Sequence, residues 1–194
     1  AGILAEEMGT VLAASPFIST AVIAATALRG TGSGALEQIA AGKAIYALAV
    51  DEGAKHAPLK TALKAEKSGN GFRLSGVKTF VADGGSADRV LVLARTAGGA
   101  GEADGLTLFD IDADRAGLQR DAIDTVDSRD HTRLTFDGLE ATGADIVGEL
   151  DGGLDAIRCG LQAGQAALAA ELTGLSGGAY AMTLGYLKER KQFD

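Results

Sequence analysis

Two short segments contain the residue types most suited to ligand chemistry. The chain ends in Arg190-Lys191-Gln192-Phe193-Asp194, directly after a long stretch rich in alanine and glycine. A guanidinium offers forked donors that match phosphate oxygens, but a basic residue near a helix C-terminus also complements the helix dipole. For Arg190 alone the dipole explanation is favoured. Residues 76–85 (GVKTFVADGG) form the second segment and lie between two strand-like runs.

Other polar candidates have plain structural explanations. Asp155 and Arg158 are three residues apart and share a helix face, so an ion pair worth about 0.2–0.5 kcal/mol accounts for them. His56 and His131 lack the spacing of a metal site, and Cys159 has no partner that would make it a nucleophile. We therefore expect no metal. The sequence also has no Walker-type loop and no supported dinucleotide fingerprint.

Composition narrows the class of protein. Of the 194 residues, 46% are hydrophobic and 23% are charged, and the net charge of -8 gives a pI near 4.8. A chain with this negative charge shows no excess of positive charge for binding nucleic acid or an anionic membrane. One cysteine fits a reducing compartment, and no apolar run approaches the ~20 residues of a membrane span. We expect a cytoplasmic protein, and the missing initial Met and abrupt ends indicate a piece of a longer chain.

The positioning elements fall into three parts, which together predict an α+β multidomain fold. Residues 1–42 show helical spacing of apolar side chains and are expected to end an N-terminal helical domain. Residues 43–148 contain strand-length runs, including 72–74, 78–81, 90–94, 106–111 and 132–136. Turn residues separate these runs, with a hairpin signal at Ser68-Gly69-Asn70-Gly71. We expect one antiparallel β-barrel or sandwich there. Residues 149–194 are expected to form the first long helix of a C-terminal helical bundle.

The last helix has a broad apolar pattern. Two rows spaced by sevens, Leu154-Leu161-Leu168-Leu175-Met182 and Gln165-Leu172-Ala179-Tyr186, predict a stripe for bundle packing. Its many glycines allow close helix contact, yet each weakens an isolated helix by about 1 kcal/mol relative to alanine. The helix therefore needs neighbours from a missing segment or from another subunit.

The order of helices, β-domain and long helix ending in Arg-Lys-Gln-Phe resembles the acyl-CoA dehydrogenase family. The resemblance extends from Ala5-Glu6-Glu7-Met8-Gly9 to Phe193 and includes Lys78-Thr79-Phe80-Val81-Ala82, where the family has Lys-Thr-Trp-Ile-Thr. It implies FAD as the cofactor. Phe80 would take the place of a tryptophan that covers the flavin, and backbone groups of Val81 and Ala82 would donate to it.

The resemblance also implies roles on the last helix. Arg190 would contact the pyrophosphate of an FAD held by a neighbouring subunit, with Gln192 in register and Phe193 near the cofactor. Asp155 and Arg158 resemble an Asp-x-x-Arg motif beside the acyl-CoA site. Some members carry the catalytic glutamate just before that arginine. Here the position is Ile157, so no catalytic base is identified.

The chain departs from the family where side-chain hydroxyls are expected. Val50, His56 and Ala82 stand at positions of a flavin-bonding Thr, a phosphate-side Ser and a further hydroxyl. At about 0.5–1.5 kcal/mol per hydrogen bond, the loss amounts to several kcal/mol of flavin affinity. Lys55 and His56 admit an alternative, in which positive charge replaces the lost phosphate loop. A solvated loop is the favoured interpretation.

The implied reaction is α,β-dehydrogenation of an acyl-CoA, with electrons passing to an electron-transfer flavoprotein. Two hypotheses follow from the departures. Either the chain belongs to an active enzyme whose flavin is held mainly by backbone groups and by residues outside this sequence, or it is the silent subunit of a hetero-oligomer that completes its partner's FAD site. The resemblance implies a homo- or hetero-oligomer, arranged as a dimer of dimers. A binding-only module is a third and weaker alternative.

Overall fold

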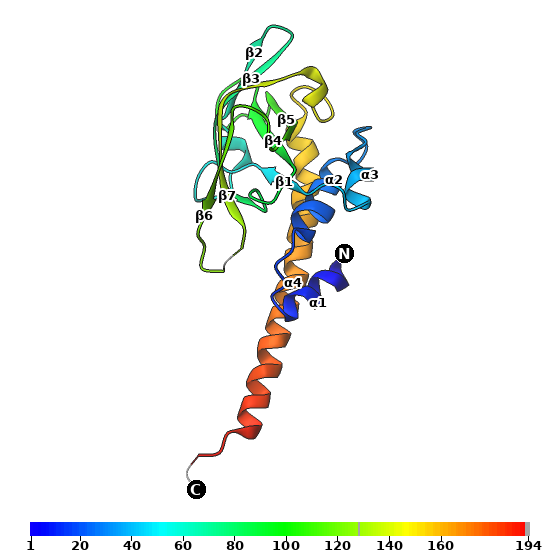
Figure 1. The fold of residues 1–194 in the computed structure, drawn as a ribbon, viewed down its shortest axis with the longest axis vertical. Coiled ribbons are helices and arrows are strands. Elements are labelled where there is room, and N and C mark those ends of the chain that lie inside the picture. Colours follow the sequence, from blue (N-terminus) through cyan, green and yellow to red (C-terminus); the bar gives the residue numbers. More distant parts are fainter. Residues whose placement is uncertain (128, 193–194) are drawn as a thin grey trace.

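The computed structural model describes residues 1–127 and 129–192. A curled β-sheet lies against one end of a long helix, and short N-terminal helices cross that helix lower down (Figure 1). The helices are α1 (Gly2–Thr10), a π-helical segment (Phe17–Ala24) continuing into α2 (Ala25–Ala27), α3 (Ala35–Ala40) and α4 (Gly153–Glu189), with 3-10 turns at Pro58–Lys60 and Gly143–Asp145. The strands are β1 (Tyr46–Ala49), β2 (Lys64–Ser68), β3 (Gly71–Ala82), β4 (Arg89–Arg95), β5 (Leu106–Asp112), β6 (Leu118–Ile123) and β7 (His131–Ala141).

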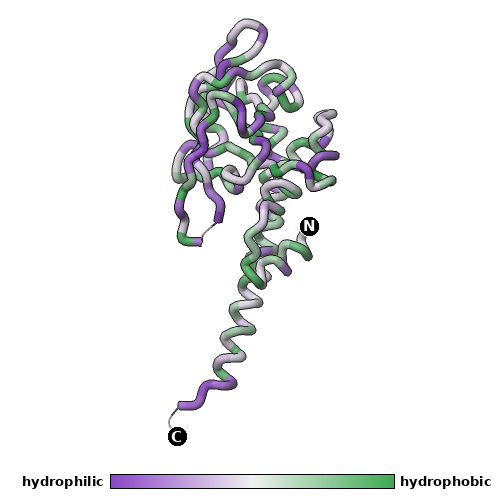
Figure 2. Tube along the Cα trace, viewed as in Figure 1, coloured by the Kyte–Doolittle hydropathy of each residue, from purple (hydrophilic) through white to green (hydrophobic). Residues whose placement is uncertain are grey.

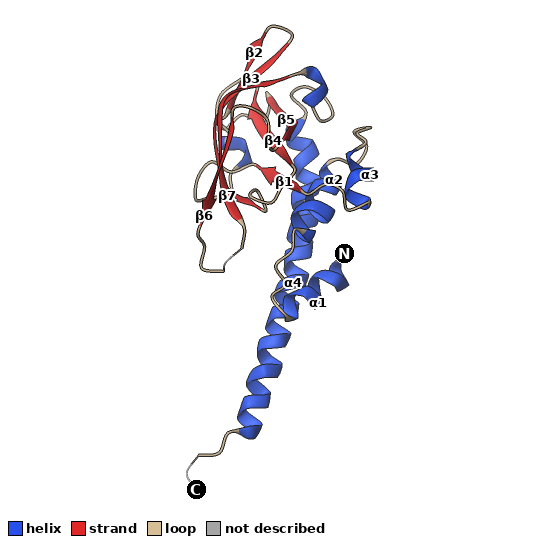
Figure 3. Ribbon diagram, viewed as in Figure 1, coloured by secondary structure: helices blue, strands red, loops and turns tan. Residues whose placement is uncertain are grey.

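The α+β class is confirmed, and the strands form one sheet (Figure 3). The strand order is β1-β4-β2-β3-β7-β6, with β5 paired to β4. The β2–β3 hairpin turns where the sequence predicts it, with Ser68 opposite Gly71. Four of the strand pairs are antiparallel, but β4 runs parallel to β1 and also to β2, so the sheet is mixed and the expected purely antiparallel sheet is wrong. Parallel neighbours need a long connection, and between β1 and β4 the chain passes through the β2–β3 hairpin.

Two features of the sheet differ from the sequence prediction. Residues 72–74 and 78–81, predicted as separate strands, belong to the single strand β3, whose pairing with β7 shifts between Leu74 and Gly76 and again between Lys78 and Val81. Strand β6 was not predicted, because its sequence LQRDAI is polar and its side chains are exposed or half-exposed. The second shift in β3 shapes the candidate site.

Strand β4 divides two apolar cores. Val90 and Val92 face the inside of the curled sheet, where the rings of Phe72 and Phe109 meet edge to face at 5.6 Å between centroids. Leu91 faces the other way, toward the core shared with α2 and α4. Alternate side chains of a strand point to opposite faces, so the continuous apolar run of β4 fits a strand covered on both sides.

Helix α4 packs through its small residues. The buried positions repeat at spacings of four and three along the helix: Gly153, Ile157, Gly160, Gly164, Ala167, Glu171 and Gly174. The two seven-spaced rows of the sequence analysis instead face outward over the C-terminal half of α4, where Leu172 is 60% and Met182 78% exposed. The tube of this half is partly green, the colour of hydrophobic residues (Figure 2). Within the described residues, no helix is long and apolar enough to cross a membrane.

Candidate functional site

An exposed aromatic ring marks the second register shift of β3. Phe80 has a left-handed backbone with φ of 52° and is 50% exposed. Such a conformation costs a non-glycine residue on the order of 1–3 kcal/mol and is most common at functional sites. The flanking Thr79 amide donates to the Asp51 carbonyl over 2.8 Å. The strained residue therefore lies beside the start of the loop that connects β1 to β2.

That loop is fixed by two carboxylates. Asp51 accepts hydrogen bonds from the Ala57 amide at 2.9 Å and contacts His56 Nδ1 at 2.8 Å. The carboxylate of Glu52 accepts from the backbone amides of Ala62 and Leu63. Both side chains therefore hold the loop from within. His56 contacts this frame through Nδ1, while its side chain is 51% exposed; the phosphate role considered from the sequence stays a prediction.

A buried lysine completes the frame beneath the loop. Lys78 Nζ, whose side chain has no exposed surface, lies 2.8 Å from Glu52 Oε1 and donates to the Val50 carbonyl, also at 2.8 Å. Its third partner is the Thr61 hydroxyl at 3.3 Å. Burial lowers the pKa of Lys78, and the Glu52 carboxylate opposes that effect. Lys78, the first residue of the Lys-Thr-Phe-Val-Ala segment, therefore stabilises the structure of the β1–β2 loop.

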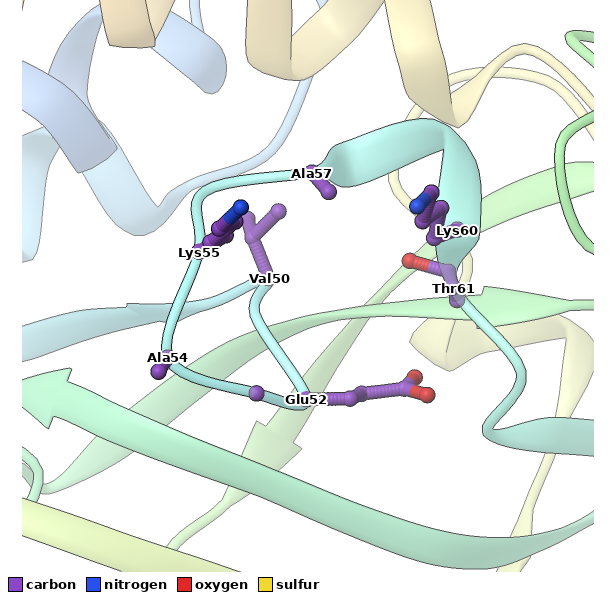
Figure 4. A pocket seen from close by; sticks show the side chains of 8 residues that line it. Val50, Glu52, Ala54, Lys55, Ala57, Lys60 and Thr61 are labelled. Atoms are coloured by element: carbon purple, nitrogen blue, oxygen red, sulfur yellow. The ribbon is translucent and has the colours of Figure 1, made fainter.

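A cavity of about 290 Å³ opens inside the loop. Its lining includes Lys55, Lys60 and Thr61, together with Glu52 and small residues. The close view shows Lys55 and Lys60 on opposite sides of the opening, with Thr61 next to Lys60 (Figure 4). Thr61 is 1% exposed, so its side chain forms part of the floor.

Arg95 fixes the wall that carries Lys60. Among the described residues its guanidinium is bonded only to backbone carbonyls, including Leu59 at 3.0 Å and Thr61 at 2.9 Å on one side and Asp104 at 3.0 Å on the other. The β4–β5 loop also donates to this wall through the Gly101 amide, 2.7 Å from the Leu59 carbonyl. Five donors in a planar fork allow one guanidinium to tie two loops together.

The predicted substrate pair lies elsewhere. Asp155 and Arg158 are 3.3 Å apart on the surface of α4, with side chains 84% and 60% exposed. Asp155 lines a second cavity of about 390 Å³ between α2 and α4, together with Arg29 and Cys159. No residue lines both cavities. A substrate role for Asp155 and Arg158 stays a prediction.

The chain terminus is described only in part. Helix α4 ends at Glu189, and Arg190 takes an extended backbone with its guanidinium 5.4 Å from the centre of the Tyr186 ring. Both Arg190 and Gln192 are exposed. Phe193 lies outside the described residues. Their contact with a neighbouring subunit's cofactor stays a prediction.

Two of the positions that lack hydroxyls lie in different surroundings. Val50 is 5% exposed and belongs to the core beside α4, whereas Ala82 is exposed at the end of β3. Ile157 is fully buried in the same core as Val50. An aliphatic side chain there can take no proton, so the described residues 153–189 of α4 supply no base at that position.

A polar junction between sheet and helices was missed from the sequence. Ser19 donates to Asp83 over 2.5 Å, and Arg129 forms an ion pair with the nearly buried Glu171 of α4. Burial raises the pKa of Asp83, although the Ser19 hydrogen bond opposes it. One signal was available: Glu171 is a charged residue at the buried spacing of α4, between Ala167 and Gly174.

Comparison with known sequences identifies the middle region. Residues 50–139 match the family described as acyl-CoA dehydrogenase, middle domain. The chain is 30% identical over 138 residues to the mitochondrial short/branched chain specific acyl-CoA dehydrogenase of Rattus norvegicus, covering 70% of this chain and 31% of that protein. It is 31% identical over 192 residues to acyl-CoA dehydrogenase FadE27 of Mycobacterium tuberculosis, covering 96% and 48%. The chain thus spans less than half of either relative.

Solved structures share the fold along the whole chain. A glutaryl-coenzyme A dehydrogenase with glutaryl-CoA superposes with a TM-score of 0.90 at 21% identity, over 100% of this chain and 51% of that one. A chain in the ChsE4-ChsE5 complex of Mycobacterium tuberculosis gives a TM-score of 0.82 at 28% identity, over 100% and 50%.

Proposed function

Because the chain belongs to the acyl-CoA dehydrogenase family, we propose that it forms part of an FAD-dependent enzyme that introduces an α,β double bond into an acyl-CoA thioester. The observation that carries the proposal is Phe80, held in a strained backbone with half of its surface exposed. A flat aromatic cofactor would stack on this exposed ring, and such a ligand contact would explain why a strained backbone is kept at this position.

The residues present fit a flavin in specific ways. The Phe80 ring offers an apolar face for stacking, and its backbone lies in the register shift between Lys78 and Val81, outside the regular β3–β7 pairing. Backbone groups of Val81 and Ala82 follow at the strand end and are the proposed donors. FAD supplies the hydride acceptor when bound. This chain's part is to hold and orient the ring system and to exclude water from one side.

Other contacts are proposed to involve further parts of the assembly. Arg190, Gln192 and Phe193 are proposed to reach the FAD of a neighbouring subunit in a dimer of dimers, where a guanidinium suits a pyrophosphate. Asp155 and Arg158 are proposed to lie along the CoA part, beside the second cavity. The α-proton needs a base that residues 153–189 do not supply at Ile157, so another segment is proposed to provide it.

Two further elements of the proposal rest on the family and on composition. Electrons are proposed to pass to an electron-transfer flavoprotein, since a reduced flavin must be reoxidised before the next turnover. A cytoplasmic location is proposed because a single free cysteine suits a reducing compartment.

A second candidate function is a silent subunit in a mixed oligomer. Val50 and Ala82 lack the hydroxyls that a flavin would accept bonds from or donate to, and Ile157 cannot act as a base. A chain similar to this one comes from a structure described as a complex of ChsE4 with ChsE5. In this alternative the chain contributes Arg190 and Gln192 to a partner's cofactor.

FAD titration of the full-length protein tests the proposal, alone and with a co-encoded homologue. Flavin absorbance and fluorescence report the number of sites and their affinity. We expect Phe80→Ala to weaken FAD binding about 10-fold, corresponding to roughly 1.4 kcal/mol, while Val77→Ala, at another exposed position of β3, leaves it unchanged. Uptake only in the presence of the homologue favours the silent subunit. Equal affinity of the Phe80 variant and the parent protein would remove the flavin role of this site.

A further inference from the structure

The end of strand β3 beyond its second register shift is short and carries the proposed flavin donors. Regular pairing with β7 resumes at Val81 and stops at Ala82, so two residue pairs hold this end of the strand. Left-handed residues lie on both sides of it, Phe80 with φ of 52° and Asp83 with φ of 57°. A strand end with so few ladder bonds opens readily unless other contacts hold it.

The turn that follows the strand is held on the sheet side by Asp130. Its carbonyl accepts a hydrogen bond from the Asp83 amide at 2.8 Å, and its carboxylate accepts from the amides of Gly85 at 3.2 Å and Ser86 at 2.8 Å. The Ser86 hydroxyl donates to the same carboxylate at 2.7 Å. Because Asp130 directly precedes β7, these bonds set the shape of the turn but not its position relative to the helices.

Ser19 links this turn to the helical layer. Its hydroxyl donates to the Asp83 carboxylate over 2.5 Å, between residues 64 positions apart in the chain. Ser19 is 4% exposed and lies in the π-helical segment Phe17–Ala24, and π-helical turns are rare and frequently occur at functional sites. The next residue, Thr20, bonds to the backbone of Tyr46 in β1 at 3.0 Å. Two successive hydroxyls of this segment therefore hold two different strands.

The π-helical segment is itself fixed against α4. A Cβ added at Gly164 of α4 would lie 2.7 Å from Ile23 Cγ1, and one added at Gly160 would lie 2.7 Å from the Ile23 carbonyl oxygen. The two elements are therefore as close as glycine allows. Beside the turn, the ion pair of Arg129 with Glu171 forms a second link to α4. A group bonded to this packed layer has little freedom to shift.

We propose that Ser19 and Asp83 are positioning residues, which set the place of the Val81 and Ala82 backbone groups relative to the helical layer. The inference rests on the proposed function in one respect, since it takes these backbone groups as donors to a flavin. Hydrogen bonds weaken steeply when their angle is poor, so a strand end that shifts would lose flavin contacts while the fold stays intact. Both side chains act through the backbone of the strand end.

Amide hydrogen exchange of the full-length protein without flavin tests the link between Ser19 and Asp83. We expect Ser19→Ala to speed exchange of the amides of residues 81–86 about 5-fold, as for the loss of one hydrogen bond. Asp83→Asn keeps an oxygen that accepts from Ser19 and tolerates the left-handed backbone, so its exchange should stay within about 2-fold of the parent protein.

Thr20→Val is the matched control, because it removes the adjacent buried hydroxyl of the same segment, whose bonds go to β1. It should lower the Tm without changing exchange at residues 81–86. Equal exchange in Ser19→Ala and the parent protein, or equal acceleration by Thr20→Val, would overturn the inference.

Flavin titration then tests the positioning role. Ser19→Ala should weaken FAD binding about 5-fold and change the absorption spectrum of the bound flavin, while Asp83→Asn and Thr20→Val should match the parent protein in both. A Ser19→Ala protein with faster exchange but unchanged flavin affinity and spectrum would overturn the positioning role and leave the proposed function intact. A parent protein that takes up no flavin would remove the proposed function and the flavin role together. Faster exchange in Ser19→Ala would then identify the link as a structural contact.

Discussion

Two glycines on one helix should respond in opposite ways to the same substitution. Gly174 and Gly177 both lie within α4, one turn apart. A Cβ added at Gly174 would come 1.8 Å from the Glu6 carbonyl oxygen of α1, whereas one added at Gly177 has no atom within 4 Å. Gly174→Ala should therefore destabilise the protein, and Gly177→Ala should stabilise it.

Comparing Gly174→Ala with Gly177→Ala isolates the effect of the contact between α1 and α4 on stability. Alanine gains about 1 kcal/mol over glycine inside a helix, and this gain is common to both variants. Ordinary contact begins at 3.4 Å, so Gly174→Ala has a deficit of 1.6 Å (3.4 − 1.8) against backbone atoms that cannot rotate away. Overpacking of this kind costs about 1–3 kcal/mol, and a backbone contact belongs at the upper end. The two variants should differ by about 3 kcal/mol, equivalent to roughly 6–12 °C in Tm for a chain of this size.

Urea unfolding and calorimetry measure the difference directly. Gly9→Ala supplies the same test from the other helix, because its Cβ would come 2.0 Å from the Glu171 carbonyl oxygen. It should resemble Gly174→Ala in both the sign and the size of its effect. If Gly174→Ala is as stable as Gly177→Ala, then α1 does not cross α4 at this distance and the small-residue packing is wrong.

The buried Lys78 and the partly buried Asp83 give further predictions. Glu52→Gln leaves Lys78 without its counter-charge, which should reduce the free energy of unfolding by about 3 kcal/mol. Adding Lys78→Met to that variant should recover part of the lost stability. If Glu52→Gln changes the free energy of unfolding in urea by less than about 0.5 kcal/mol, the ion pair is dispensable for stability. Burial raises the pKa of Asp83, so its charge destabilises the folded protein at neutral pH, and that penalty disappears as the pH falls through the raised pKa. Asp83→Asn should be the more stable form at pH 7, with an advantage that shrinks toward pH 4; an advantage that is constant with pH would contradict the burial argument.

Much of the fold follows from local patterns in the sequence. The apolar run of β4, the hairpin at Ser68 and the small residues of α4 each have one dominant physical explanation. Strand β6 shows no such local pattern, because it is an edge strand whose residues are held in place by pairing with β7. Edge strands carry polar and charged side chains that discourage further pairing, and this property hides them from a search for alternating hydrophobicity.

The candidate site was harder to predict from the sequence than the fold. Residues 76–85 indicated the right strand, but the register shift that exposes Phe80 depends on how β3 pairs with β7. The position of Lys60 depends on Arg95, 35 residues further along the chain (95 − 60), whose bonds are all to backbone carbonyls. Contacts of this kind leave no pattern in the sequence, since any residue can supply a carbonyl.

The construction of the β1–β2 loop explains how the family fold and the ligand contacts can change separately. Asp51, Glu52 and Arg95 hold the loop through backbone groups, so its shape does not depend on which side chains its exposed residues carry. The same separation means that a shared fold does not carry the shared activity. Whether this chain binds flavin through Phe80 is therefore decided by the FAD titration and not by the shared fold.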